Sequence, residues 1–163
     1  MGLKSQNMSQ MFTRLSRLKE VPNIADHEMA QIAQEIKHTA HDMAPTEYNN
    51  IRKAIKVRRE GGTEQGTKGF LKGVSNYSVY VDGSMPAHGH AEQTVGEYVW
   101  MVHEHMGWEG HPGAIMPSKQ SLQAGNGIDP VGGKFIDRAT QKHKINSAVR
   151  IQKVVRDYVH RLD

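Results

Sequence analysis

Residues 21–45, "VPNIADHEMAQIAQEIKHTAHDMAP", constrain the fold more strongly than any other stretch of the chain. Apolar side chains recur there at three- and four-residue spacing: Met29, Ile32, Ile36, Ala40 and Met43. This period predicts an amphipathic α-helix with one buried stripe. Asn23 is a good candidate for the N-cap, with Asp26 in the capping-box position. Pro45 predicts where the helix ends.

Two further segments carry the same helical period. Residues 1–20 place apolar side chains on one face: Met8, Met11, Phe12, Leu15 and Leu18. Residues 134–163 form a second long stripe, with Ala148, Ile151, Val155, Tyr158 and Leu162 on it. Both patterns predict amphipathic helices, one at each end of the chain.

The middle of the chain favours strands and loops. Alternation and β-branched composition predict strands over 76–83 and over 95–102, "VGEYVWMV". The glycines of 61–69 suggest a hairpin connection, and the segment lacks the GxxxxGK(S/T) pattern of a phosphate-binding loop. Residues 107–133 are rich in Gly and Pro, which disfavour regular structure. Because the segment is also long, we expect 109–132 to be an exposed loop that orders against a neighbouring subunit. The fold class expected is α+β, an antiparallel sheet packed by helices.

Length and composition bound the domain organisation. The 163 residues suit a single α+β domain at 23–163 preceded by an N-terminal arm or helix at 1–22. There is no cysteine, which excludes disulfides and thiolate metal sites. No apolar run approaches the ~20 residues of a membrane span, so no membrane partner is expected.

Charge is segregated along the chain. Residues 1–72 carry 12 Lys/Arg and 8 Asp/Glu, residues 73–133 carry Lys119 against six acidic residues, and residues 134–163 carry 8 against 3. Copies of such a chain can attract one another through unlike patches, as in a heterologous ring. The alternative is that folding mixes these charges into an ordinary surface.

Histidines and glutamates cluster around "YVWMVHEHMGWEGHPG", residues 98–113. The cluster comprises His88, His90, His103, His105 and His111, with Glu104 and Glu109. The spacing fails the HExxH motif, whose histidines lie four apart on a helix. On the expected extended backbone, His103 and His105 point the same way and Glu104 the other. A metal-binding hydrolase that uses the His88–His111 cluster stays an alternative, but neither a third ligand nor a catalytic triad can be assembled, so we expect no catalytic residue, metal or cofactor.

Several separated segments resemble one family. "HDMAPTEYNNIRKAI" at 41–55 matches a helix that ends in Ala-Pro and is followed by an Ile-Arg-x-x-Ile step. "YVWMVHE" at 98–104 matches a Tyr-x-x-x-Val-His-Glu segment, and "GGKFIDRAT" at 132–140 matches the opening of a C-terminal helix. In this order, these segments resemble the tail-completion, or head–tail joining, proteins of tailed bacteriophages. Asn50 stands where the family usually has glycine, and 114–132 is longer than its usual link.

The resemblance implies a structural virion protein of the neck, assembled in the host cytoplasm, and not an enzyme. It implies a homo-oligomeric ring, commonly of six copies, between the head connector or adaptor proteins and the tail terminator or tail tube. DNA would pass through the lumen without specific binding. A basic nucleic-acid-binding protein is the remaining alternative, although the Lys and Arg of the last helix fall on several faces instead of one.

Candidate interface residues follow from both lines of argument. Trp100 and Trp108 are expected to be core or interface anchors. Glu104 is expected to shape the fold and the subunit contacts. Basic residues of the last helix are expected to meet the acidic middle of a neighbouring copy: Arg150, Lys153 and Arg156.

Overall fold

The computed structural model describes residues 5–46, 49–60, 76–87 and 93–162. The elements in these ranges are α1 (Ser5–Leu18), α2 (Val21–Met43), α3 (Asn49–Ala54), β1 (Ile55–Glu60), β2 (Asn76–Val81), α4 (Val95–His105), α5 (Lys119–Gln123) and α6 (Phe135–His160). The three helices expected from apolar periodicity are confirmed as α1, α2 and α6.

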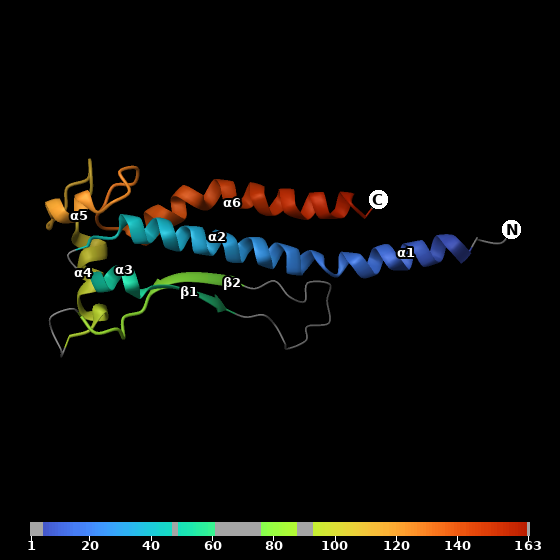
Figure 1. The fold of residues 1–163 in the computed structure, drawn as a ribbon, viewed down its shortest axis with the longest axis horizontal. Coiled ribbons are helices and arrows are strands. Elements are labelled where there is room, and N and C mark those ends of the chain that lie inside the picture. Colours follow the sequence, from blue (N-terminus) through green and yellow to red (C-terminus); the bar gives the residue numbers. More distant parts are fainter. Residues whose placement is uncertain (1–4, 47–48, 61–75, 88–92, 163) are drawn as a thin grey trace.

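A long antiparallel pair, α2 and α6, forms the axis of an elongated molecule (Figure 1). Helix α1 continues the direction of α2 and projects past the end of α6. The expected N-cap at Asn23 is wrong, because Glu20 already has helical dihedrals (φ −83°, ψ −13°) and serves as the N-cap. Asn23 lies in the first turn, where its amide donates to the Glu20 carboxylate at 2.9 Å. Helices α1 and α2 are thus nearly collinear and are separated by a short break at residues 19–20.

Strands β1 and β2 form a two-stranded antiparallel sheet. Ile55 lies opposite Val81, and Glu60 lies opposite Asn76. Both strands pack on α2, and Figure 1 shows them along the opposite side of α2 from α6. The expected α+β fold with an antiparallel sheet and a long C-terminal helix is confirmed. The expected hairpin connection at 61–69 lies outside the described residues.

The strand expected over 95–102 is wrong, because this segment begins helix α4. Its β-branched and aromatic composition favours a strand, but Val95, Val99, Val102 and Met106 also recur at helical spacing. Val95, Val102 and Met106 are buried. Thr94 is the N-cap, and the Glu97 carboxylate accepts from the Thr94 N–H at 3.4 Å, which gives the segment a capping box.

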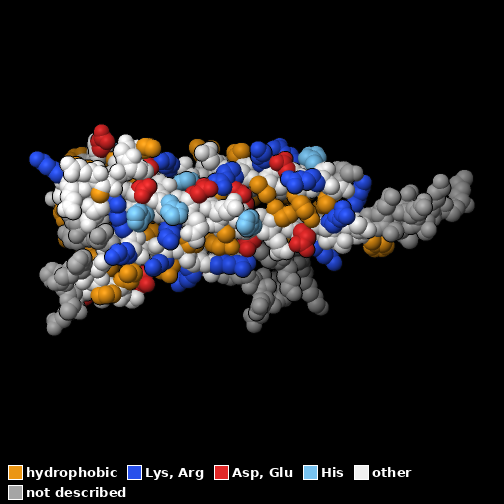
Figure 2. All heavy atoms as spheres, viewed as in Figure 1, with side chains coloured by type: hydrophobic (Ala, Val, Ile, Leu, Met, Phe, Trp, Pro, Cys, Tyr) orange, Lys and Arg blue, Asp and Glu red, His pale blue; other side chains and the backbone are white. Residues whose placement is uncertain are grey.

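The core lies at one end of the α2–α6 pair, where α3, α4 and the start of α6 meet. Its largest fully buried side chains are Phe135, Ile51, Ile55, Val95 and Val102. Burying each such side chain contributes about 1.5–3 kcal/mol. Toward the other end, large apolar side chains stay in solvent on α1 and α6. Lys and Arg run along most of the visible face with Asp and Glu between them (Figure 2), so folding mixes the signs there.

None of the helices within the described ranges is both long and apolar enough to span a bilayer.

Candidate functional site

The histidine-rich motif lies at the C-terminal end of α4. Residues two apart on a helix project to different sides. The ring of His103 accordingly meets Phe135 edge-on, with centroids 5.0 Å apart, whereas the ring of His105 meets Trp100 at 4.9 Å. The expectation that His103 and His105 point the same way is wrong, since it assumed extended backbone. The two rings therefore do not converge on one ligand.

Glu104 joins the end of α4 to the start of α6. Its carboxylate accepts hydrogen bonds from the Lys134 ammonium and, at 2.9 Å, from Nδ1 of His103. The hydrogen bond from Lys134, followed by the one from His103, lowers the pKa of Glu104 below its ordinary value. An ionised carboxylate only accepts, so Nδ1 of His103 carries the proton. We call His103, Glu104 and Lys134 the α4–α6 clasp.

The backbone at the start of α6 reinforces the clasp. Lys134 has a left-handed conformation (φ 53°), and its N–H donates to the His103 carbonyl at 2.7 Å. Gly133 passes so close to α4 that a Cβ there would collide with the carbonyl oxygen of Met106. Phe135 follows, with no exposed surface. The "HE" and "GGKF" segments are therefore two halves of one structural joint.

Arg138, one turn into α6, holds the end of the loop at 107–133. Its guanidinium donates to the carbonyls of Gly133 (2.9 Å), Pro130 (2.7 Å) and Gly132 (3.3 Å). The Arg138 guanidinium also lies over the Trp108 ring, 4.9 Å from its centroid, and Trp108 stacks on His111 at 4.6 Å. Burial lowers the pKa of Arg138 from its ordinary value. Trp108, an expected anchor, is thus held within its own chain.

A second set of contacts fixes the loop to the end of α2. The backbone N–H of Thr46 donates to Oγ of Ser121 on α5 at 2.7 Å, and Ser121 is fully buried. Arg52 donates to the carbonyls of Ala44 (2.8 Å) and Ala124 (3.4 Å). The expectation that 109–132 is simply an exposed loop is therefore wrong in part. Its backbone is anchored at several points, although many of its side chains lie in solvent.

The basic candidates on α6 separate into two groups. Arg150 is engaged inside the chain, where it donates to Glu28 at 2.8 Å and pairs with Glu35, both on α2. Glu28 is buried, so Arg150 neutralises a carboxylate that water cannot reach freely. Lys153 and Arg156 are exposed. Arg150 therefore makes hydrogen bonds within its own chain, and its contact with a neighbouring copy stays a prediction.

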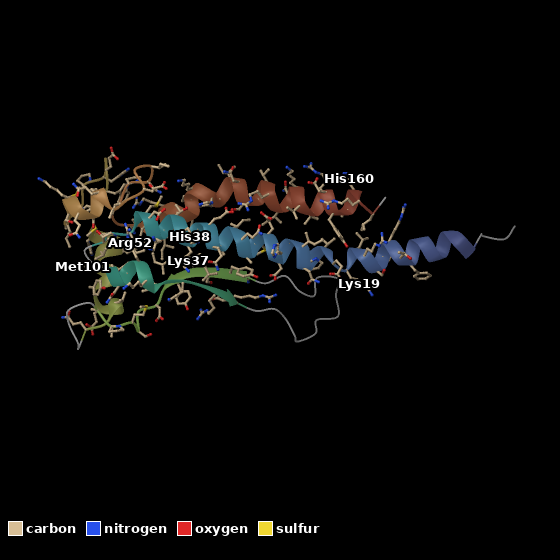
Figure 3. The ribbon with its side chains drawn as sticks, in the orientation of Figure 1. Lys19, Lys37, His38, Arg52, Met101 and His160 are labelled. Carbon is tan, nitrogen blue, oxygen red and sulfur yellow. The ribbon has the colours of Figure 1, made fainter. Side chains whose placement is uncertain are left out.

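Two apolar side chains of α4 extend into solvent, Trp100 (65% exposed) and Met101 (39%). Figure 3 places Met101 at the end of the molecule opposite to Lys19, which follows α1. Glu97 and Glu104 lie on the same face of α4 by helical spacing. This face of α4 therefore combines carboxylates with apolar side chains that the rest of the described chain leaves exposed.

Among the described residues, no three His, Asp or Glu side chains gather as metal ligands would. His88 and His90 lie outside the described residues. A hollow of about 140 Å³ lies beside the loop, lined in part by Glu109, Leu122 and Ile128. Small-molecule sites usually measure about 300–1,000 Å³. The described site is therefore a structural contact between α4 and α6, next to the exposed face of α4.

No protein-family model, curated protein or solved structure matches this chain.

The sequence prediction did not identify two half-buried arginines, Arg52 and Arg138, as residues that organise the site; Arg52 entered it only as part of the Ile-Arg-x-x-Ile step. Arg138 falls one helical turn after Lys134, just past a glycine- and proline-rich segment. A basic side chain at that place can bind the loop carbonyls, which have no partners of regular secondary structure. The position of Arg138 in the sequence was therefore the signal that could have identified it.

Proposed function

We propose that this chain is a structural virion protein of a tailed bacteriophage, a neck or tail-completion subunit. Copies of it would form a ring, with six as the expected number, that joins the tail to the head connector. It would act by assembly and not by catalysis, and would be built into the neck in the host cytoplasm. DNA would pass through the lumen without sequence-specific binding.

The observation that carries the proposal is the contrast between the motif residues and the exposed apolar ones. The motif residues make contacts between elements: Arg52 of α3 binds the end of α2, and His103, Glu104 and Lys134 form the α4–α6 clasp. Motif residues in such positions maintain the shape of the chain, as a structural role requires. Large uncovered apolar side chains lie on α1, α4 and α6, where Phe12 is 62%, Trp100 65% and Ile145 78% exposed, and others lie in the loop at 107–133. Exposed apolar surface of this kind is typical of proteins that bind other proteins.

The elongated shape also supports an assembly role. Helix α1 projects beyond the rest of the molecule (Figure 1), so one copy can reach a neighbour with little rearrangement. Neither alternative has comparable support. The divergent rings of His103 and His105 disfavour a metal hydrolase built on these two residues. The Asp and Glu side chains that lie among Lys and Arg on the visible face (Figure 2) disfavour a continuous nucleic-acid surface.

The mass of the purified protein, alone and with tail tubes of the phage that carries its gene, tests the proposal. We expect a closed oligomer of one defined copy number bound at the end of each tube, seen by native mass spectrometry and electron microscopy. A protein that stays monomeric and leaves the tubes bare at every concentration would exclude the proposed role.

A further inference from the structure

Helix α1 presents an apolar stripe that its own chain leaves in solvent. Phe12, Leu15 and Leu18 are 62%, 45% and 40% exposed. By helical spacing they share one side of α1, with Arg14 at one edge of that side and Lys19 directly after the last residue of the helix. No Asp or Glu occurs from Ser5 to Lys19. The stripe is therefore apolar in the middle and cationic at its borders.

Helix α4 presents the complementary surface at the other end of the molecule. Trp100 and Met101 form its exposed apolar centre, and Glu97 and Glu104 lie before and after them on the same face. Residues 73–118 contain no Lys or Arg. Lys134 partly neutralises Glu104 through the clasp, so Glu97 supplies most of the negative charge of this face.

We propose that the α1 stripe of one copy docks on the α4 face of a second copy of this chain. The two surfaces match in shape, because both are single helix faces, and in chemistry, because an apolar centre with cationic borders meets an apolar centre with carboxylates. They lie at opposite ends of an elongated molecule (Figures 1 and 3), so they cannot meet within one chain.

A contact between two different surfaces is heterologous. It joins copies in a row, in which the first copy keeps one of the two surfaces free and the last copy keeps the other. Such contacts close into a ring when the rotation between neighbours permits it. The inference rests on the proposed function only for the identity of that ring. Trp100 is the expected centre of the contact, because large aromatic side chains dominate binding energy at interfaces.

Cross-linking between single-cysteine variants tests the contact directly, since the natural chain contains no cysteine. Leu15→Cys protein is mixed with Met101→Cys protein under mild oxidation, and the mixed disulfide dimer is measured by mass spectrometry. We expect it to be the main product. The matched control replaces Met101→Cys by Ile145→Cys, on α6, where Ile145 is even more exposed (78%); it should give little mixed dimer.

Equal yields with Met101→Cys and Ile145→Cys would overturn the proposal, because cross-linking would then follow exposure alone. Dimers formed only between two Leu15→Cys copies would also overturn it, since they would show α1 pairing with α1. Both outcomes leave head–tail joining free to be tested separately. Conversely, if the expected dimer forms but the protein does not join heads and tails, the proposed function is excluded and the contact between copies stands.

Two substitutions give an independent readout of association by analytical ultracentrifugation. Trp100→Ala should weaken it by at least about tenfold, whereas Ile128→Ala, at an 81% exposed position away from α4, should leave it unchanged. Glu97→Gln keeps the capping-box acceptor and removes the charge. It should slow association about twofold or more at low salt, with the difference lost at about 1 M salt, where charges are screened beyond about 3 Å. The proposal would be contradicted if either Trp100→Ala or Glu97→Gln associated as wild type does.

Discussion

Arg150 of α6 donates a 2.8 Å hydrogen bond to the buried carboxylate of Glu28 on α2. The same guanidinium pairs with Glu35, two turns further along α2. The long helix pair is therefore fixed by charges as well as by its apolar stripe. A residue that the sequence placed among the interface candidates thus stabilises its own chain.

Replacing Arg150 by Ala should destabilise the monomer. The change leaves Glu28 buried without its charged donor, and such losses cost about 1–3 kcal/mol. The side chain of Arg150 is 36% exposed, so we expect the lower half of that range. Urea unfolding measures the effect, with Lys153→Ala as the control on an exposed face of the same helix, expected within about 0.5 kcal/mol of wild type. Equal stability of the two variants would show that the Arg150 pairs are of no consequence.

Stability should fall in acid, and Glu35 should contribute to the fall. The hydrogen bond from Arg150 lowers the pKa of Glu35 below its ordinary value of 4.5. A lowered folded-state pKa means that the contribution is fully present above about pH 4.5 and is lost as pH falls through the folded-state pKa. In urea unfolding at a series of pH values, Glu35→Gln should be less stable than wild type near pH 7, and the two should converge in acid. A constant gap between them down to pH ~3 would contradict the assignment.

Gly133→Ala should test how tightly α6 starts against α4. The new Cβ would collide with the Met106 carbonyl, which is backbone and cannot rotate away. Overpacking of this kind costs about 1–3 kcal/mol. Gly127→Ala is the matched control, because Gly127 has φ 71° and open space around it, so only the left-handed conformation is penalised, by about 1 kcal/mol. If Gly127→Ala proved the more harmful, the close approach at Gly133 would be of little importance.

Arg138→Lys should loosen the loop at 107–133 without unfolding the chain. Lysine keeps the charge but cannot place a planar fork of donors on the carbonyls of Pro130, Gly132 and Gly133. Trypsin should then cut after Lys119, on α5, faster than in wild type. Lys144→Arg, a conservative change on an exposed part of the same helix, should leave the cleavage rate unchanged. Identical cleavage in Arg138→Lys and wild type would mean that the other contacts of the loop, such as those of Ser121 and Arg52, hold it without the Arg138 guanidinium.

The long elements were predictable because their apolar period repeats over several turns. Ile32, Ala40 and Met43 of α2 are buried as the sequence indicated. Helix α4 was not predicted, because β-branched and aromatic residues satisfied the composition of a strand while Val95, Val99 and Val102 also satisfied a helical period. The capping box at Thr94 and Glu97 was the sequence signal that distinguished the two.

The site was less predictable, since its contacts join residues far apart in the chain. Sequence alone could not pair Arg150 with Glu28 or Glu104 with Lys134, because these partners lie far apart in the chain and many other Lys and Arg residues could pair with each carboxylate. It did identify Trp100 as a candidate anchor, and the exposure of Trp100 agrees with a role outside its own chain.

Head–tail joining in the absence of the protein tests the central proposal most directly. Cells infected with phage whose copy of this reading frame is interrupted should accumulate filled heads and finished tails that stay apart under the electron microscope. Adding the purified protein to that extract should join them and restore infectious particles. Joined, infectious virions in the mutant lysate without added protein would contradict the account, as would a block to head filling or tail assembly that the purified protein does not relieve.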